Sequence, residues 1–428
     1  MTRMKDSGIE WIGEMPEEWG IKPIKHIFGA IGSGTTPDSS KVEYYDGNIN
    51  WLQSGDLYKK DYVYAVSKTI TDLGYRSSAS LRIYQAPFLA IAMYGASIGN
   101  LAISKIDACV NQAVAVLKGE ENIVRFTKLA LEISKTELIF AAQGGTQPNI
   151  NQVLIKNWVI PFPSEIEIKK IADFLDKKVA QLDKVKSLLE EQIKTLEDYR
   201  QSLIYETVTK GLDKTVPLKD SGVDWIGQIP EGWEIGRLKD FVKFQTGTTP
   251  PQSVGVNQDE SGVPWFKPGD FSDNSIDLLS SENHITHEVV MQYNLSVYPK
   301  KTILLVGIAS IGKVGYSAQP SYSNQQITAL RTIGEIYPRY LAYLMFSSGR
   351  FIKETALYTV VPIINNQYLA TMRLVLPSEN EQKIIVEYLD RKLEQINQMI
   401  AIKKEQIENI NKQRQTLIYD YVTGKRRV

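Results

Sequence analysis

Loops rich in asparagine, glutamine and threonine are the segments of this sequence best suited to binding a ligand. The amides of Asn and Gln place a donor beside an acceptor and can make two hydrogen bonds to one adenine edge, while Thr can bond to several bases. The alternative is that these side chains bond to their own backbone and hold turns. If the ligand is a nucleic acid, the candidates for base contact are Thr35, Thr36, Gln143, Gln147, Asn149 and Asn151 in the first half, and Thr248, Thr249, Gln252, Asn365, Asn366 and Gln367 in the second.

Basic side chains that could bind phosphate are scattered along the chain. Phosphate contacts position a protein on a duplex without specifying its sequence, but an ordinary solvated charge explains each of these residues equally well. With 49 basic and 49 acidic residues the chain has no net charge, whereas nucleic-acid-binding proteins are usually basic. A binding surface must therefore arise from local segregation of charge or be shared with a partner protein. The candidates for phosphate contact are Lys59, Lys60, Arg76, Lys300, Lys301 and Lys313.

Motifs for catalysis are absent from the sequence. It contains no [DN]-P-P-[YFW] tetrapeptide of the kind found in amino-methyltransferases, no phosphate-binding G-x-x-x-x-G-K-[ST] and no G-x-G-x-x-G. His284, His287 and Glu288 do not form the H-E-x-x-H zinc motif. We therefore expect no catalytic residue and no metal site.

Cysteine content and apolar run length indicate the compartment. The chain has one cysteine, Cys109, which cannot form an internal disulfide, and its flanking residues Ala108 and Val110 predict a core position. No apolar run approaches the ~20 residues of a membrane span, and the N-terminus has no apolar leader. We expect a cytoplasmic protein that does not bind a membrane.

The chain is a tandem duplication. Residues 5–19 read KDSGIEWIGEMPEEW and residues 219–233 read KDSGVDWIGQIPEGW. Further matches preserve the same order at an offset of 213 or 214, which indicates two copies of one fold. They are Gly34-Thr-Thr-Pro37 with Gly247-Thr-Thr-Pro250, Ala96-Ser-Ile-Gly99 with Ala309-Ser-Ile-Gly312, Asn111-Gln112 with Asn324-Gln325, and Pro163-Ser-Glu165 with Pro377-Ser-Glu379.

Each copy divides into a globular part and a long helix. Short β-rich runs such as Phe88–Ala92 and Ile303–Val306 alternate with turn residues, and a helical stretch follows in each copy, which predicts an α+β domain. After Pro163 and Pro377 the sequence becomes charged and lacks Gly and Pro, which is typical of a long helix. The predicted boundaries are 1–163 and 213–377 for the domains, and 164–212 and 378–428 for the helices.

Heptad repeats in both helices predict a coiled coil. We expect Ile171, Val185 and Tyr199 at the interleaved positions of the first helix. A generic helical hairpin or a homodimeric coil is the alternative, but two matched helices in one chain can pair antiparallel, with pseudo-two-fold symmetry. The main seam comprises Ile168, Leu175, Leu182, Leu189, Leu196 and Leu203 in the first helix and Leu389, Ile396, Ile410 and Leu417 in the second.

Two further groups of residues allow a structural and a functional interpretation. The entry segments carry Trp11, Trp19, Trp225 and Trp233, which we interpret as packing anchors rather than as platforms for base stacking. The C-terminal segment 425–427 is expected to be a solvated tail rather than a phosphate contact.

With the duplication established, the sequence resembles the specificity subunits of type I restriction-modification systems. The residues that carry the resemblance are the D-S-G-[IV]-[ED]-W-I-G-x-[MI]-P-E-x-W opening of each half, the G-T-T-P turns, the segment Gly144–Gln152, and helices that end with R-Q-[ST]-L-I-Y. They span essentially the whole chain. One departure is that Gly145-Thr-Gln-Pro148 becomes Thr359-Val-Val-Pro362 in the second copy, so that loop cannot do the same work in both.

The resemblance implies the fold, the partners and the division of work. The globular parts would be target recognition domains, each reading one half of a bipartite, asymmetric double-stranded DNA site. The helices would set the spacing and dock two methyltransferase subunits, which restriction subunits then join. The chain itself would hold no cofactor, because S-adenosylmethionine and ATP with Mg²⁺ would belong to the partners. The alternative from another class is an assembly scaffold that does not read DNA.

Overall fold

The computed structural model describes residues 3–142, 148–249, 262–355, 357–358 and 362–428. Gln143, Gln147 and Gln252 lie outside the described residues. The chain divides into two compact units, of which unit 1 comprises Met1–Leu188 with Glu405–Val428 and unit 2 comprises Leu189–Lys404. Each unit therefore holds one globular domain, part of the helix that follows it, and part of the other long helix.

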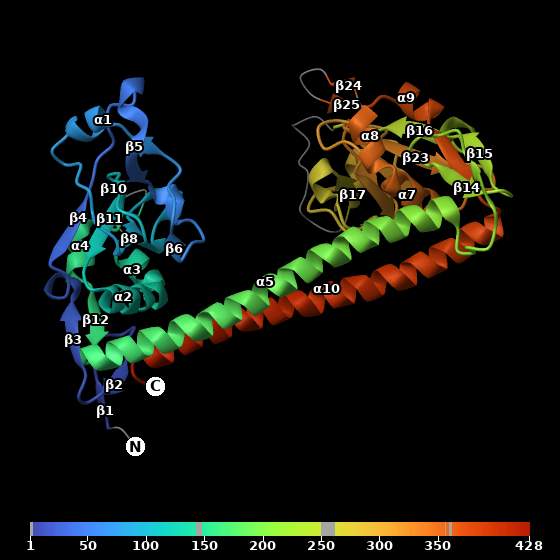
Figure 1. The fold of residues 1–428 in the computed structure, drawn as a ribbon. Coiled ribbons are helices and arrows are strands. Elements are labelled where there is room, and N and C mark those ends of the chain that lie inside the picture. The colour runs from blue at the N-terminus through green and yellow to red at the C-terminus, as the bar shows by residue number, and fades with distance from the viewer. Residues whose placement is uncertain (1–2, 143–147, 250–261, 356, 359–361) are drawn as a thin grey trace. The chain divides into compact units, whose positions relative to one another are not determined.

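Two small β-sheets form the core of the domain in unit 1 (Figure 1). The strands β1 (Met4–Asp6) and β2 (Glu14–Pro16) form a hairpin, and β3 (Gly20–Pro23) pairs antiparallel with the distant β12 (Val159–Phe162), which immediately precedes the first long helix. The five-stranded sheet has the order β4 (Ala30–Ser33), β11 (Val114–Lys118), β8 (Phe88–Ala92), β9 (Leu101–Ser104) and β6 (Tyr62–Val63). The three-stranded sheet has the order β10 (Cys109–Val110), β5 (Tyr45–Leu52) and β7 (Thr69–Ile70).

The domain in unit 2 repeats this topology strand for strand. Here β13 (Leu218–Asp220) and β14 (Gln228–Pro230) form the hairpin, and β15 (Glu234–Arg237) pairs antiparallel with the distant β26 (Arg373–Leu376). The five-stranded sheet has the order β16 (Val242–Thr246), β23 (Ile327–Thr332), β20 (Thr302–Val306), β21 (Val314–Ser317) and β18 (Asp277–Leu278). The three-stranded sheet has the order β19 (His284–Ile285), β17 (Val263–Phe266) and β22 (Tyr322–Ser323), and β24 (Leu357–Tyr358) pairs with β25 (Pro362–Ile363).

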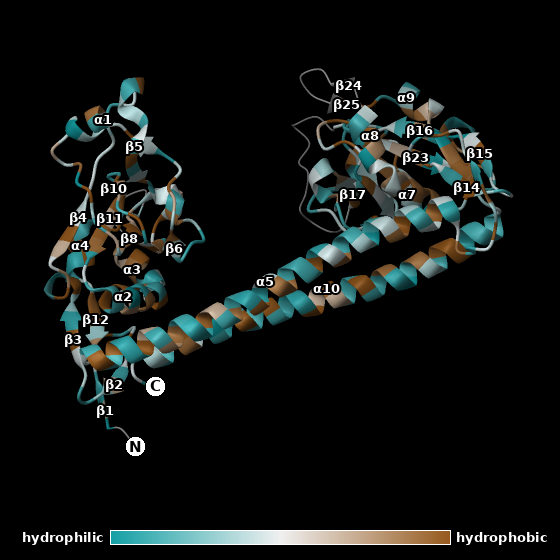
Figure 2. Ribbon diagram, viewed as in Figure 1, coloured by the Kyte–Doolittle hydropathy of each residue, from teal (hydrophilic) through white to brown (hydrophobic). Residues whose placement is uncertain are grey.

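Short helices flank both sheets. In unit 1 they are α1 (Asp72–Arg76), α2 (Glu121–Ile133), α3 (Lys135–Ala141) and α4 (Gln152–Asn157), and in unit 2 they are α6 (His287–Gln292), α7 (Pro338–Ser347), α8 (Gly349–Thr355) and α9 (Asn366–Thr371). Helices α2 and α7 pack against the central strands of the five-stranded sheets. The predicted apolar strands are β8 and β20, and every residue of both is buried. In Figure 2 the ribbon beside the β8 label is largely brown, the colour of hydrophobic residues.

The long helices are α5 (Glu165–Lys210) and α10 (Glu379–Val422). In unit 1 the first turns of α5 pack against the last turns of α10, where the rings of Phe174 and Tyr421 lie 4.6 Å apart. In unit 2 the last turns of α5, around Ile204, pack with the first turns of α10, around Leu389. Early residues of one helix meet late residues of the other in both units, so the predicted antiparallel pairing is confirmed.

The seam of the first helix differs from the prediction at its interleaved positions. Val185 and Tyr199 are 47% and 52% exposed. Buried residues instead lie four positions after Ile168, Leu175 and Leu196, at Ala172, Val179 and Arg200. The a-to-d step of a heptad is three or four residues. Ile171 misled the assignment because it is buried in the same core cluster of unit 1 as Ile168 and Leu175, although it lies three positions after Ile168. Along the main seam, Ile168, Leu175, Leu389 and Ile396 are fully or nearly fully buried, and Leu182, Leu189, Leu196, Leu203, Ile410 and Leu417 are partly buried.

The two ends of the chain meet in unit 1. Trp19 is 1% exposed and donates to Glu167 Oε1 at 3.5 Å, as Trp233 donates to Glu381 Oε1 at 3.2 Å, which confirms these tryptophans as packing anchors. Residues 425–427 are exposed, as predicted for a solvated tail, but the tail is not free, because Arg427 pairs with Glu18 and Glu167. In the described part of the chain, no helix combines the length and apolar character needed to cross a membrane.

Candidate nucleic-acid interface

The polar loops shared by the two copies converge on one end of each five-stranded sheet. In unit 1 this is the end where Ser33 pairs with Ala115 and Val114 pairs with Ala92. In unit 2 it is the end where Thr246 pairs with Thr328 and Val306 pairs with Ile327. Residues scattered over more than a hundred positions of sequence are thus collected into one loop cluster per domain.

The first contact in the cluster joins the G-T-T-P turn to the Asn-Gln turn. Thr36 Oγ1 donates to Gln112 Oε1 at 2.5 Å, and Thr249 makes the same hydrogen bond to Gln325. Close approach explains the glycine that begins the turn, because a Cβ on Gly34 would lie 1.7 Å from the carbonyl oxygen of Val110. Only glycine allows this contact between the two loops.

A second contact brings the start of a short helix to the same place. Asn151 caps α4 by accepting from Leu154 N at 2.9 Å, and Asn365 caps α9 by accepting from Tyr368 N at 2.8 Å. The residue after each cap ties the helix to the sheet. Gln152 Nε2 donates to Ser33 Oγ at 2.8 Å, and Asn366 Nδ2 donates to Thr246 Oγ1 at 3.2 Å. Asn151 and Asn365 therefore hold the backbone, as the alternative interpretation of these residues proposed, whereas Asn366 bonds to the side chains of Thr246 and Thr328.

The remaining described candidates for base contact lie at the cluster surface, where their contact with bases stays a prediction. Thr36, Asn149, Thr249 and Gln367 are exposed. Thr35 is half-buried, and its carbonyl oxygen accepts from Trp51 Nε1 at 3.3 Å. The Thr248 hydroxyl bonds to Tyr322. Gln112 and Gln325 were missed as candidates, although their repetition at matching places in both copies was the signal that could have found them.

The candidates for phosphate contact are dispersed over the domains. Lys59, Lys60, Arg76, Lys300 and Lys301 are exposed. Lys313 is different, because its ammonium bonds to the Phe271 carbonyl oxygen at 3.2 Å and pairs with Asp273 at 3.1 Å. Its side chain is only 22% exposed, so its charge is already engaged within the domain.

An arginine clamp fixes each domain to its own long helix. Arg125 pairs with Asp173 and Asp176 of α5 at 2.8 and 2.7 Å. Arg339, at the equivalent position, pairs with Asp277 at 2.6 Å and with Asp390 of α10 at 2.9 Å.

Each clamp also engages a tyrosine. Burial, reinforced by Asp176, raises the pKa of Tyr62 to about 12, and burial and the hydrogen bond to Asp390 raise the pKa of Tyr343. Both phenols therefore remain neutral donors to the clamp aspartates at physiological pH.

A charge network beside the clamp occurs in unit 1 only. Lys128 pairs with Asp61 and Glu132, and Arg414 of α10 pairs with Glu132 and Asp183. At an offset of 214, Lys128 corresponds to Ala342, Asp61 to Ser275 and Glu132 to Phe346. Arg414 corresponds to Arg200, and Asp183 to Asn397. Of this network, unit 2 keeps only the arginine.

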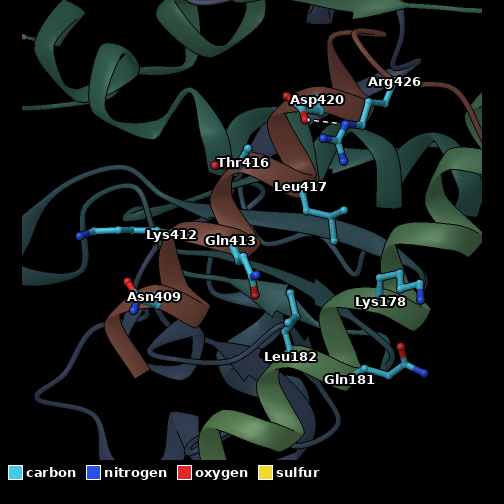
Figure 3. Close-up of a pocket in the computed structure, with 10 residues that line it drawn as sticks. All are labelled: Lys178, Gln181, Leu182, Asn409, Lys412, Gln413, Thr416, Leu417, Asp420 and Arg426. Carbon is cyan, nitrogen blue, oxygen red and sulfur yellow. Dashed lines mark ion pairs between the residues drawn. The ribbon is translucent and has the colours of Figure 1, made fainter. Parts of the chain in front are cut away.

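The long helices form a separate polar groove in unit 1. It has a volume of about 890 Å³ and, as Figure 3 shows, is lined by side chains of α5 and α10 and by Arg426. Leu182 and Leu417 lie within it, and Asp420 pairs with Arg426 at 3.2 Å. None of the candidates for base or phosphate contact lines this groove.

Two copies of one α+β domain, each with a polar loop cluster and each clamped to a long helix, define a duplicated recognition module. The family model described as "Type I restriction modification DNA specificity domain" matches residues 16–197 and again residues 230–411. The chain belongs to this type I restriction-modification DNA specificity family.

Individual relatives agree with the family match. The type I restriction enzyme MjaIX specificity subunit of Methanocaldococcus jannaschii is 24% identical over 441 residues, which cover 97% of this chain and 95% of that protein. The EcoBI specificity subunit of Escherichia coli is 25% identical over 324 residues, covering 71% and 65%. These named relatives give no support to a scaffold that does not read DNA.

Solved structures show the same fold. One chain, from a structure described as "Structural basis underlying complex assembly and conformational transition of the type I R-M system", aligns with a TM-score of 0.75 and 16% identity over 95% of this chain and 98% of that one. The HsdS subunit of Thermoanaerobacter tengcongensis aligns with a TM-score of 0.52 and 17% identity over 96% and 98%.

Proposed function

We propose that each domain reads one half of a bipartite, asymmetric DNA site. The observation that carries this proposal is that one loop cluster is built twice, by the same Thr–Gln contact and the same capped helix, on domains whose other residues have diverged. A repeated framework with different surroundings suits two half-sites that are recognised in the same way but differ in sequence.

Replacement of one domain tests this assignment. Residues 20–160 would be exchanged for the corresponding domain of a relative, and the methylated sites of a host expressing the chimera with its methyltransferase partner would be mapped. We expect one half-site to change and the other to remain. A map in which both half-sites change together, or neither does, would contradict one domain per half-site.

We propose further that α5 and α10 set the distance between the half-sites and dock two methyltransferase subunits, which restriction subunits then join. The polar groove between the helices in unit 1 is a surface on which a protein partner could dock.

An insertion that preserves the heptad tests the spacing role: seven residues after Leu188 and seven after Lys404 add about 10 Å of helix. Because DNA rises ~3.4 Å per base pair, the preferred spacer should lengthen by about three base pairs. An unchanged spacer in an active complex would contradict this role.

We propose that the chain itself is not a catalyst. The absence of methyltransferase and nucleotide-binding motifs from the sequence supports this. S-adenosylmethionine and ATP with Mg²⁺ would be bound by the partner subunits, in the cytoplasm. Calorimetry on the purified chain should show no binding of S-adenosylmethionine, and saturable binding would contradict the proposal.

Since the net charge is zero, tight specific binding to DNA should also require the methyltransferase subunits.

A further inference from the structure

Gln112 and Gln325 occupy the same place in the two loop clusters. Each is exposed at its turn, and each accepts one hydrogen bond on Oε1 from a threonine hydroxyl, Thr36 or Thr249. Among the described residues no partner is found for Nε2 of either glutamine. Toward the described part of the chain, each amide therefore keeps two N–H donors and one lone pair on Oε1.

The glutamines are not needed to hold their turns. In unit 1 the preceding Asn111 does so, because its Oδ1 accepts from Ala113 N at 3.1 Å. In unit 2 Asn324 does the same by accepting from Gln326 N at 3.1 Å. The glycine that begins each G-T-T-P turn provides the close approach between the loops. Asn111 and Asn324, together with the two glycines, thus stabilise the backbone of the loops. The glutamine amides bond to the neighbouring G-T-T-P turn instead.

The threonine restricts the orientation of the amide. A glutamine side chain that is free to rotate loses rotamer entropy on binding, and a hydrogen bond formed beforehand reduces this loss. The edge that remains, with the carbonyl acceptor beside the amino donor, matches adenine, whose N6 donates and whose N7 accepts in the major groove.

We propose that Gln112 and Gln325 each read an adenine, at equivalent places in the two half-sites. The inference rests on the proposed function, and it adds that two otherwise different half-sites share one A·T pair, recognised by the same Gln–Thr device. Thr36 and Thr249 are positioning residues, because they act through the glutamine amide.

The first experiment maps base preference in methylated DNA. Gln112→Ala and Gln325→Ala would each be assembled with the methyltransferase partner in a host without other methylation. Gln112→Ala should lower discrimination at one A·T pair of the first half-site on the order of 10- to 100-fold. Its other positions and the whole second half-site should be unchanged, and Gln325→Ala should give the reciprocal result.

Two further variants separate base reading from structural support. Thr36→Val should relax the same position as Gln112→Ala, but less. Gln319→Ala is the matched control, because this exposed glutamine follows β21 at the opposite end of the sheet, where Ser317 pairs with Thr302. It should leave every position unchanged. If Gln112→Ala and Thr36→Val lowered thermal stability equally and left base preference intact, the pair would be structural and the proposal would be wrong.

A second measurement does not depend on how well a variant folds. The wild-type complex would be titrated with duplexes in which each adenine of the site is replaced by 7-deazaadenine, which lacks the N7 acceptor. We expect about a tenfold loss of affinity or more at one adenine per half-site, and Gln112→Ala should abolish the loss in the first half-site only. No sensitive adenine, or one indifferent to the variant, would overturn the glutamine proposal while the assignment of domains to half-sites stands. A variant that alters both half-sites would overturn both.

Discussion

The arginine three residues before the last leucine of each seam provides a matched pair of perturbations. Arg200 and Arg414 begin the same R-Q-[ST]-L-I-Y motif. Arg414 binds the carboxylates of Glu132 and Asp183, which outweigh the effect of burial and raise its pKa. Arg200 is 3% exposed and donates to the amide oxygens of Asn274 and Asn397, while its buried Nε has no partner among the residues that the structure describes. Burial lowers its pKa, because Glu197 only partly compensates.

Replacement of each arginine by methionine should therefore have unequal effects. Removing one partner of a buried ion pair costs roughly 3–5 kcal/mol. The Glu132 and Asp183 side chains are 25% and 42% exposed, and Glu132 keeps Lys128, so we expect Arg414→Met to destabilise unit 1 by about 2 kcal/mol. In Arg200→Met the loss of two hydrogen bonds, at about 1 kcal/mol each, is offset by the removal of an uncompensated buried charge, so unit 2 should change by about 1 kcal/mol or less.

Native-state hydrogen exchange resolves the two units separately. The reporters are amides of the equivalent buried strands β8 and β20, whose exchange reflects the opening of unit 1 and of unit 2. We expect Arg414→Met to lower the opening free energy at β8 and Arg200→Met to leave β20 nearly unchanged. Equal losses in the two units, or a larger loss from Arg200→Met, would refute the argument from carboxylate pairing.

Three further predictions follow from the same contacts. Burial would raise the pKa of Glu132, but Lys128 and Arg414 lower it, so the stability that Glu132 contributes to unit 1 is present above the unfolded pKa of ~4.3 and is lost as pH falls. The opening free energy measured at β8 should therefore depend less on pH in Glu132→Gln than in the wild type. The raised pKa of Asp183 acts in the opposite direction in both proteins. Arg339→Gln should lower the free energy of unfolding of unit 2, measured by chemical denaturation, by about 2–3 kcal/mol. Arg350→Gln is the control, because this side chain is 90% exposed, and it should cost less than about 0.5 kcal/mol. Similar losses in the two variants would contradict the role of the clamp. Gly424→Ala should lower the melting temperature more than Gly8→Ala, because both glycines have positive φ but only at Gly424 would a Cβ meet Pro16, at 2.5 Å; equal shifts would exclude that clash.

The sequence was sufficient to predict the architecture, because its signals are repeated. The duplicated entry segment, the heptads and the apolar strands around Phe88 and Ile303 each occur twice, so that each copy supports the other. The interleaved seam was misassigned because Ile171 is buried in a cluster that contains residues of both the domain and the other long helix. A hydrophobic residue near a helix start can be buried by either partner, and its spacing alone does not distinguish them.

The candidate site was predicted less well, because its decisive contacts are not local. Asn151 and Asn365 lie in loops of the expected composition, but only the fold shows that their side chains cap helices. Gln112 looks like an ordinary turn residue until the chain brings Thr36, 76 residues away, to its Oε1.

The contrast between the two arginines shows how duplicated domains can be used to separate framework from local adaptation. Arg200 and Arg414 lie in nearly identical sequences, yet their partners lie 74 to 282 residues away and differ in charge. Contacts found in both copies, such as the Thr–Gln pair and the Arg–Asp clamp, can be attributed to what both domains must do. Contacts found once, such as the Lys128–Glu132 network, are local adaptations of one domain. Since the Thr–Gln pair is the shared contact that ends in an exposed hydrogen-bonding edge, it is the part of the framework best placed to meet a base.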